Sequence, residues 1–497
     1  MTTISPSAEQ AVLDGVRGEL FIGGTWRAAT GGGTLAVEDP ATGETLMHVA
    51  DATVADGDAA LAAADAAFHD FRRMAPRERG DILRRAYELM IERTDDLALL
   101  MTLEMGKAIG ESRAEVAYAA SYFRWYAEEA VRINGRFQVA ENGLSRVLTM
   151  QQPVGPCLFI TPWTFPLAMG TRKVGPAIAA GCTCVVKPAK QTPLCMLAMA
   201  QILEQAGLPA GVCNVITASK SGAVMEPLIR DPRARKLSFT GSTAVGKALV
   251  AQASEQLLRM SMELGGNAPF LVFEDADMDK ALEGAMLAKM RNIGEACTSA
   301  NRFLVHESIA DDFAEQLAGR MRKLTLGRGT QDGVTTGPLI DQKAREGVHE
   351  LVTDALDKGA ELLVGGSPRE GAGYFYEPTV LAGVPADARL NAEEIFGPVA
   401  PVVRFADDAQ AIELANASEY GLSSYVFTQD IDRAFAVFEA LETGMVGFNQ
   451  GMVSNAGAPF GGVKQSGYGR EGGPEGLQEY LETKYVAMNL GGVPPKS

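Results

Sequence analysis

Short apolar segments that alternate with helical ones constrain the fold of this 497-residue chain more than any other feature. The run PCLFITPW (156–163) is bounded by prolines and predicts a buried strand, whereas PLCMLAMAQILEQAG (193–207) predicts a helix that ends at a glycine. Further strands are predicted at 182–189, 211–218 and 236–241. Strands that alternate with helices at this spacing are typical of an α/β fold with a parallel, doubly wound sheet.

A second block of the same kind follows along the chain. Strands are predicted at 269–275 and 302–309, and a helix at 311–324. In the earlier range 57–128, apolar side chains lie on one helical face and charged ones on the other, which predicts helices. The glycine-rich range 444–473 has the composition of a flexible linker, but apolar and aromatic residues interrupt it. We therefore expect an ordered loop whose backbone approaches a ligand or another segment.

Length and charge limit the possible partners. At roughly 100–200 residues per domain, the chain has room for two to four domains. Its net charge of −17 disfavours nucleic acid and anionic membranes, because both require a basic face. The sequence starts without the features of a signal peptide, and no apolar run reaches the roughly 18 residues of a membrane-spanning helix. We expect a cytoplasmic protein.

Cysteine and histidine usage gives no indication of a metal site. The six cysteines are spread along the chain, and the four histidines are widely separated. No Cys/His spacing is typical of zinc ligands. We therefore expect catalysis without a metal. We also expect reduced thiols, because a domain of this size does not depend on disulfides.

Two side chains are candidates for covalent chemistry. Cys297, in NIGEACTSANRF, lies between a predicted helix and a predicted strand, where a loop thiol becomes reactive if its surroundings favour the thiolate. A buried, inert thiol is the alternative, and it suits the other cysteines. Glu263, in SMELGG, lies among apolar residues that raise a carboxyl pKa toward that of a general base. For Glu263 the alternative is a surface charge at a helix end.

The segment FTGSTAVGKA (239–248) combines a strand, a glycine turn and a helix. This layout places backbone N–H groups and a helix N-terminus against a phosphate. Gly241 and Lys247 have the spacing of a P-loop, but Ala248 stands where that motif needs a serine or threonine to bind magnesium. A P-loop NTPase is therefore disfavoured, and a chance glycine turn remains the alternative.

Seven motifs together resemble the aldehyde dehydrogenase superfamily. In chain order they are PWTFP, KPAKQTP, FTGST, MELGGN, GEACTSANR, EIFGPV and PFGGVKQSG. One such motif is modest support, but seven in the family's order are highly specific. The resemblance runs from about residue 20 to about residue 490 and implies a Rossmann-like cofactor domain, an α/β catalytic domain and a small β extension that joins subunits.

The resemblance implies a role for each residue of the reaction centre. Cys297 is similar to the family's nucleophile, whose thiolate attacks the aldehyde, and its backbone N–H is one donor to the resulting oxyanion. Glu263 is similar to the base that activates the water for thioester hydrolysis. Glu394 is expected to hold the nicotinamide ribose, and Phe396 to help position the nicotinamide.

The remaining cofactor contacts follow from the same resemblance. Lys187 is expected to hydrogen-bond the adenine ribose, and Gly241 and Ser242 to contact the pyrophosphate, with Trp163 nearby. Relatives that prefer NAD carry a glutamate where this chain has Lys190, and a lysine attracts the 2′-phosphate that a glutamate repels. We therefore expect NADP to be accepted alongside NAD, with a preference for NADP left open.

Within the superfamily, the chain is most similar to succinate-semialdehyde dehydrogenases. Arg172 and Arg291 match that group's carboxylate-binding arginines, and Ser454 matches its substrate-binding serine. A four-carbon aldehyde with a distal carboxylate needs a cationic clamp, and arginine forms bidentate pairs with carboxylates. Surface salt bridges are the alternative for the two arginines.

One departure from the family's pattern concerns the oxyanion. Thr164 stands where the family has an asparagine in PWNFP, and loss of such a donor costs about 2.7–4 kcal/mol of transition-state stabilisation. A catalytically weakened or specialised protein is therefore one alternative. Oxidation of glutarate semialdehyde, or of a neutral or aromatic aldehyde, is another.

The resemblance also divides the chain into domains. It places a cofactor-binding domain at 1–128 and 149–262, a catalytic domain at 263–470, and an oligomerisation extension at 129–148 and 471–497. The extension is expected to pair with a tail strand near 484–490. A homodimer or homotetramer follows by analogy.

Overall fold

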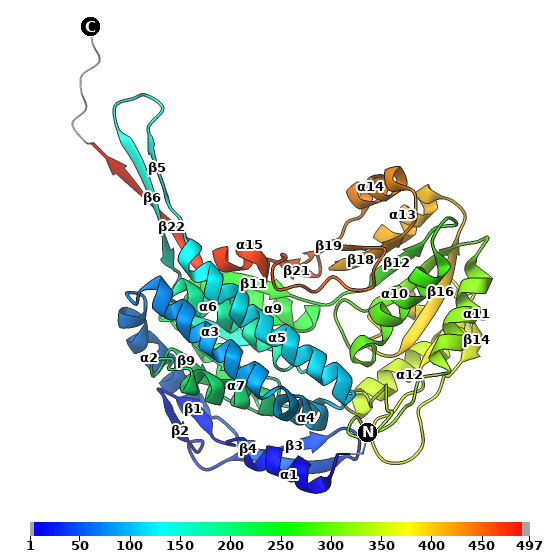
Figure 1. The fold of residues 1–497 in the computed structure, drawn as a ribbon, viewed down its shortest axis with the longest axis horizontal. Helices are drawn as coiled ribbons and strands as arrows, with labels where there is room; N and C mark the ends of the chain where they lie inside the picture. The colour runs from blue at the N-terminus through cyan, green and yellow to red at the C-terminus, as the bar shows by residue number, and fades with distance from the viewer. Residues whose placement is uncertain (1–3, 490–497) are drawn as a thin grey trace.

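The computed structural model describes residues 4–489. An eight-stranded sheet, ordered β2-β1-β9-β8-β7-β10-β11-β21, forms the centre of its larger lobe (Figure 1). The strands are β1 (Leu20–Ile22), β2 (Thr25–Arg27), β7 (Cys157–Ile160), β8 (Cys184–Lys187), β9 (Cys213–Val215), β10 (Lys236–Thr240), β11 (Arg259–Glu263) and β21 (Gly467–Tyr468). The five central strands, β7 to β11, are parallel, as the sequence predicts, and the edge pairings are antiparallel.

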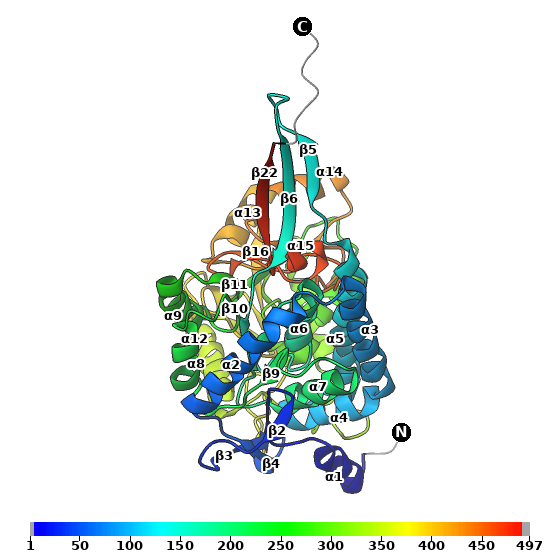
Figure 2. The same ribbon diagram turned by 90° about the vertical axis from the view of Figure 1, so that its left-hand side faces the viewer.

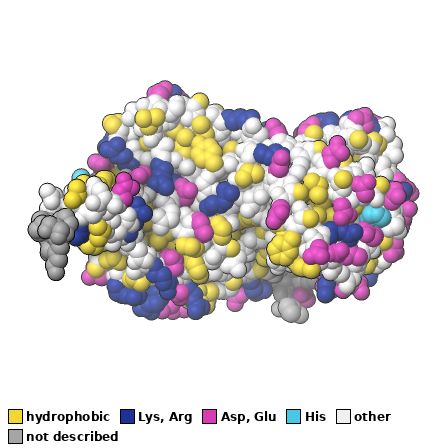
Figure 3. Space-filling model, turned by 90° about the horizontal axis from the view of Figure 1, so that it is seen from above, with side chains coloured by type: hydrophobic (Ala, Val, Ile, Leu, Met, Phe, Trp, Pro, Cys, Tyr) yellow, Lys and Arg dark blue, Asp and Glu magenta, His cyan; other side chains and the backbone are white. Residues whose placement is uncertain are grey.

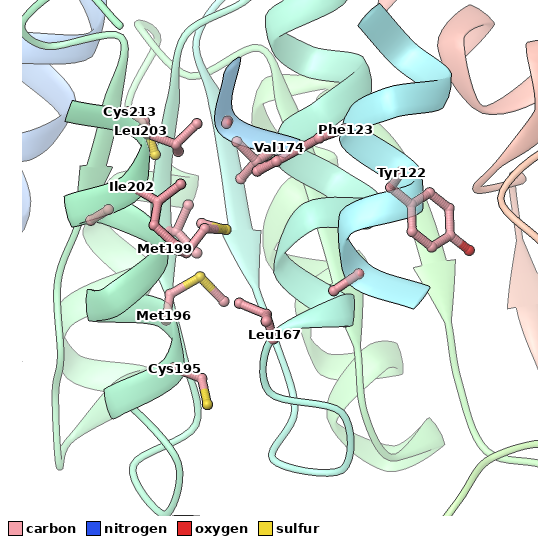
Figure 4. Close-up of a cluster of buried hydrophobic side chains, with 14 of the residues drawn as sticks. Tyr122, Phe123, Leu167, Val174, Cys195, Met196, Met199, Ile202, Leu203 and Cys213 are labelled. Atoms are coloured by element: carbon pink, nitrogen blue, oxygen red, sulfur yellow. The ribbon is translucent and has the colours of Figure 1, made fainter. Parts of the chain in front are cut away.

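Helices cover both faces of this sheet, because successive strand residues point to opposite sides. In β7, Cys157 and Phe159 belong to one apolar cluster and Leu158 to the other. Figure 4 shows part of the first cluster, where Met196 and Met199 pack near Leu167. The helices of this lobe are α2 (Val54–Phe71), α3 (Pro76–Glu92), α4 (Thr94–Met105), α5 (Ile109–Glu129), α6 (Ala168–Ala180), α7 (Leu194–Gln205), α8 (Ser221–Ile229) and α9 (Thr243–Ala253). The helices predicted in the range 57–128 are thus confirmed.

A seven-stranded sheet, ordered β14-β15-β16-β13-β12-β18-β19, forms the second lobe (Figure 1). Its strands are parallel except for β14 at one edge. The strands are β12 (Ala268–Val272), β13 (Ala300–His306), β14 (Glu361–Val364), β15 (Thr379–Ala382), β16 (Val399–Phe405), β18 (Ser423–Phe427) and β19 (Met445–Phe448). The accompanying helices are α10 (Met278–Met290), α11 (Ala310–Met321), α12 (Gln342–Asp357), α13 (Asp408–Asn416) and α14 (Ile431–Ala440).

Three antiparallel strands form an arm that projects from the first lobe (Figures 1 and 2). They are β5 (Arg136–Val139), β6 (Arg146–Pro153) and β22 (Leu481–Met488). The eight residues of β22 pair with β6 from Leu481↔Pro153 to Met488↔Arg146, which confirms the predicted pairing with a tail strand. The end of that tail, 490–497, lies outside the described residues.

Smaller elements complete the described chain. The glycine-rich range 444–473 contains β19 to β21 and the start of α15, so it is ordered as predicted. The remaining elements are α1 (Pro6–Asp14), β3 (Thr34–Asp39), β4 (Glu44–Ala50), β17 (Tyr420–Gly421), β20 (Val463–Lys464), α15 (Gly473–Gln478) and the 3₁₀ turns η1 (Ala130–Arg132), η2 (Ser254–Gln256), η3 (Arg291–Gly294) and η4 (Arg389–Asn391).

Charges of both signs mix on the surface. On the face shown in Figure 3, lysine and arginine side chains are interspersed with aspartate and glutamate. Within residues 4–489, no helix has the length and hydropathy needed to cross a membrane.

Candidate active site

The order of the first sheet reverses between β7 and β10, and loops at the carboxyl ends of such strands form the ligand crevice of open α/β sheets. Trp163 and Thr164 follow β7, while Gly241 and Ser242 follow β10. Glu263 ends β11, the next parallel strand. The fold therefore brings these five predicted residues to one edge of the sheet.

The second sheet supplies its residues from the opposite end of its strands. Cys297 precedes β13, and Glu394 precedes β16. Gly266, just before β12, donates its backbone N–H to Glu394 Oε1 at 3.0 Å. A Cβ at Gly266 would overlap the Cys297 carbonyl oxygen, so the two glycines of MELGGN permit this close approach. The candidate site thus lies between the carboxyl edge of one sheet and the amino edge of the other.

Among the free cysteines of the described chain, Cys297 alone is only partly buried. The other five are buried and belong to strands, helices or their ends. Burial raises the pKa of the Cys297 thiol to about 12, against the lowering effect of Arg172 and Arg291 and with a raising effect of Glu394 and Glu263. Two arginines and two glutamates therefore lie close enough to the sulfur to shift its pKa. The thiol is therefore neutral at physiological pH in this state.

Glu263 is a buried strand residue, so the alternative of a surface charge at a helix end is wrong. Its side chain is 1% exposed, and neither carboxylate oxygen has a hydrogen-bond partner among the described residues. Burial and the nearby charge of Glu471 raise its pKa well above the ordinary value, despite the opposing charges of Arg172 and Lys173. Such surroundings favour the neutral carboxyl over the carboxylate, and a raised pKa makes an ionised carboxylate a stronger base.

The structure brings both predicted clamp arginines close to Cys297. Arg291 donates from Nη1 to Ser454 Oγ at 3.1 Å, and its guanidinium lies 4.6 Å from the centre of the Phe165 ring. Arg172 is fully buried and lies 4.1 Å from the centre of the Phe460 ring. Neither arginine makes the surface salt bridge that was the alternative.

Two adjoining hollows run past the site. One, of about 480 Å³, is lined by Lys190 and Ser219, and the other, of about 430 Å³, by Trp163, Glu394 and Phe396. They share the lining residues Gln191, Ile340, Asp341 and Lys343. The Trp163 and Phe396 rings meet edge to face, with centroids 5.4 Å apart. Together the two hollows form a groove with aromatic rings at one end and Lys190 among charges of both signs at the other, and each has the volume of a ligand pocket.

The predicted phosphate and ribose contacts lie at the carboxyl ends of β8 and β10, at the same edge of the sheet. Lys187 is buried and donates to Ser221 Oγ at 2.6 Å, and burial together with Lys190 lowers its pKa to about 8. Ser242 is the N-cap residue of α9 and makes no side-chain cap bond, so the helix N-terminus keeps N–H groups for a ligand. The Gly241 N–H donates to the Glu263 carbonyl at 3.1 Å, so Gly241 offers close approach rather than a free donor.

Residues 26–486 match the model of the aldehyde dehydrogenase family. The chain is 58% identical to a succinate-semialdehyde dehydrogenase of Paenarthrobacter nicotinovorans, over 89% of this chain and 98% of that protein. It is 48% identical to a glutarate-semialdehyde dehydrogenase of Pseudomonas aeruginosa, over 96% and 98% of the two chains. A crystal structure of an NADP-dependent enzyme of Escherichia coli superposes with a TM-score of 0.94 at 49% identity, covering 96% of this chain and 98% of the other.

The chain belongs to the aldehyde dehydrogenase family. No group of three or more Cys, His, Asp or Glu side chains within residues 4–489 of this aldehyde dehydrogenase is arranged to hold a metal ion.

The sequence did not predict a buried charge cluster next to the candidate site of this aldehyde dehydrogenase. Glu471 forms ion pairs with Arg172 and Lys173, and all three side chains are at most 2% exposed. Burial alone would raise the Glu471 pKa, but the two cations hold it at about 2. The available signal was a charged residue within the ordered glycine-rich range. Its partners lie about 300 positions earlier in the chain and are invisible to local patterns.

The raised pKa of Cys297 predicts how its thiol reacts in the cofactor-free aldehyde dehydrogenase. Alkylation by iodoacetamide needs the thiolate, so its rate is expected to rise about tenfold per pH unit from pH 7 to pH 10. Mass spectrometry of the labelled peptide measures the rate, and Cys297→Ser provides the unlabelled control. A plateau below pH 8 would contradict the neutral thiol.

Proposed function

We propose that this aldehyde dehydrogenase oxidises succinic semialdehyde to succinate with NADP or NAD as cofactor. The arginine beside the nucleophile carries the assignment: Arg291 is held by Ser454 and by the rings of Phe165 and Tyr118, at 4.6 and 5.6 Å. A guanidinium fixed in this way next to Cys297 binds a carboxylate on the same molecule as the reacting aldehyde. The identity to a succinate-semialdehyde dehydrogenase over most of both chains supports the same substrate.

Arg172 adds a second positive charge to the clamp. Its Nη2 has no hydrogen-bond partner among the described residues, although its charge is paired with Glu471. A guanidinium has five N–H donors, so one carboxylate partner leaves donors for another. We propose that Arg291 binds the substrate carboxylate directly. Arg172 contributes its unpaired Nη2 donor and a positive electrostatic potential.

The chemistry of the site begins at Cys297. The thiol proton passes to solvent, Sγ forms a bond to the aldehyde carbon, and the new oxyanion accepts hydrogen bonds from the Cys297 N–H and the Thr164 hydroxyl. The bound cofactor supplies the hydride acceptor that turns the adduct into a thioester on Cys297. Ionised Glu263 takes a proton from the water that attacks the thioester carbon, the C–S bond breaks, and the proton regenerates the Cys297 thiol as succinate leaves.

The groove fits a nicotinamide dinucleotide in this proposal. Glu394 holds the nicotinamide ribose, Phe396 and Trp163 bound the nicotinamide, and the N-terminus of α9 after Ser242 receives the pyrophosphate. The Glu394 carboxyl has a pKa raised by burial to about 7, so it both accepts and donates hydrogen bonds to hydroxyls. Lys187 binds the adenine ribose beside the exposed Lys190.

Glutaric semialdehyde is a second candidate substrate. The P. aeruginosa relative at 48% identity carries that name, and one more methylene changes the carboxylate position by about one bond length rather than its charge. The same arginines serve either molecule.

We also propose that copies of this chain associate through the arm. Phe137, Val139 and Tyr485 on its strands are 60%, 54% and 60% exposed, which is unusual for large apolar side chains of a monomer. The arm supports the division into a cofactor-binding domain, a catalytic domain and an oligomerisation extension. A homodimer or homotetramer is the assembly proposed.

Replacement of Arg291 tests the clamp. Arg291→Leu is expected to lower kcat/KM for succinic semialdehyde by about 10- to 150-fold, because a charged hydrogen-bond partner is lost. Butanal, which has the same chain length and no carboxylate, is expected to change by less than about threefold. Arg113→Leu, which removes an exposed arginine paired with Asp95, is the matched control. Equal losses on both aldehydes would contradict the clamp.

The alternative of a catalytically weakened protein is tested at Thr164. Thr164→Asn restores a longer amide donor and is expected to raise kcat on succinic semialdehyde by up to about 10²–10³-fold, if the missing donor limits the reaction. Reduced-cofactor formation measures the rate. An unchanged or lower kcat would show that the threonine site is already competent.

Lys190 tests the basis of cofactor choice. Lys190→Glu is expected to raise the KM for NADP by about tenfold or more while the KM for NAD changes little, because the repulsion acts on the 2′-phosphate alone. Added salt is expected to reduce this difference by screening, since Lys190 is exposed. A similar change for both cofactors would place Lys190 away from the phosphate.

A further inference from the structure

A buried network joins the loop after β7 to the loop before β13. The Thr164 carbonyl accepts two hydrogen bonds, from Lys107 Nζ at 3.0 Å and from Asn292 Nδ2 at 2.9 Å. Lys107 is 1% exposed and lies between α4 and α5, and Asn292 lies five residues before Cys297. One backbone carbonyl on the oxyanion side is therefore held by donors from two distant segments.

Two carboxylates on one face of α5 anchor this network. Glu115 accepts the Lys107 ammonium and also the backbone N–H groups of Leu167 and Ala168 at 3.1 and 3.2 Å, at the start of α6. Glu111, one helical turn earlier, accepts the Asn292 backbone N–H at 2.7 Å. The first turns of α5 thus hold both the Thr164 loop and the Asn292 turn.

The Asn292 turn is strained and depends on these contacts. Asn292 and Ile293 have φ of 55° and 62°, and the β-branched Ile293 rarely adopts the left-handed region. The Asn292 amide also donates to the Glu295 carbonyl at 2.6 Å, two residues before Cys297. Strain of this kind persists where the surrounding structure over-determines it, and it occurs at functional sites.

We propose that Lys107, Glu111, Glu115 and Asn292 are positioning residues that keep Thr164 and Cys297 in the relative geometry that the first chemical step requires. The inference rests on the nucleophilic role proposed for Cys297. The Asn292 amide bridges the two loops, because it bonds both the Thr164 and the Glu295 carbonyls. The hydrogen bonds of Lys107 reach Glu115 and the Thr164 carbonyl but not the Asn292 turn. A misplacement of about 1 Å in such a site lowers the rate about 100-fold without removing a reacting group.

The test compares two variants with a matched control. Lys107→Met removes the donor to the Thr164 loop, and Asn292→Ala, a smaller perturbation of the charge network, removes the bridge. Lys236→Met is the control: Lys236 is equally buried, donates to Ser261 Oγ at 2.6 Å and pairs with Glu479 at 3.5 Å, at the amino end of β10 away from the site. All are made in the full chain and compared by thermal unfolding, by the rate of the first turnover and by alkylation of Cys297.

The two variants are expected to distinguish the effect of the Thr164 loop from that of the Asn292 turn. Lys107→Met is expected to slow the first turnover about 10- to 100-fold with unchanged alkylation of Cys297, and Asn292→Ala to alter both rates. Lys236→Met is expected to lower the unfolding temperature about as much as Lys107→Met does, and to keep the first-turnover rate of the parent. A first-turnover rate in Lys107→Met equal to the parent's, or one matched by Lys236→Met, would overturn the inference. If the parent is inactive on succinic semialdehyde, the aldehyde it oxidises fastest is used, so failure of the substrate proposal is distinguished.

Discussion

The close approach of two sheet edges at Gly265 and Gly266 is the constraint on which the rest of the site depends. A side chain at Gly266 would overlap the Cys297 carbonyl, and one at Gly265 would crowd Glu394 Oε2 at 3.1 Å. Because these positions have no side chain, the carboxyl edge of the first sheet and the amino edge of the second meet. Cys297 and Glu394 are thereby brought next to the carboxyl edge of the first sheet, where Glu263 ends β11.

Burial sets the electrostatics of this junction. The unpaired groups, Cys297 and Glu263, have raised pKa values, whereas the pKa of Glu471 is lowered because Arg172 and Lys173 flank it. A charge removed from water is tolerated where a partner accompanies it and is otherwise neutralised by a proton. The positive charges of the site therefore lie on Arg172, Lys173 and Arg291, and burial disfavours the ionised forms of Cys297 and Glu263.

Most of the fold was predictable from local patterns. Alternating apolar strands and amphipathic helices predicted two parallel sheets, and the pairing of the arm with the tail strand was also expected. Glu263 was predicted to lie among apolar residues that raise its pKa, and it ends a buried strand, so only the alternative of an exposed helix end is wrong. A single carboxylate among apolar residues is compatible with either environment, since burial depends on what packs above the sheet.

The sequence by itself determined the family, the chemistry and the candidate residues, because motif identity and spacing are local properties of the chain. Only the tertiary structure decided which charged side chains form ion pairs and which side chains hold the loops of the site in place. Glu471 pairs with Arg172 across about 300 positions, and Lys107 and Asn292 meet at the Thr164 carbonyl from segments separated by 185 residues. Such contacts arise from the packing of helices against sheets, and no periodicity in the sequence reports the distance between two side chains that packing brings together.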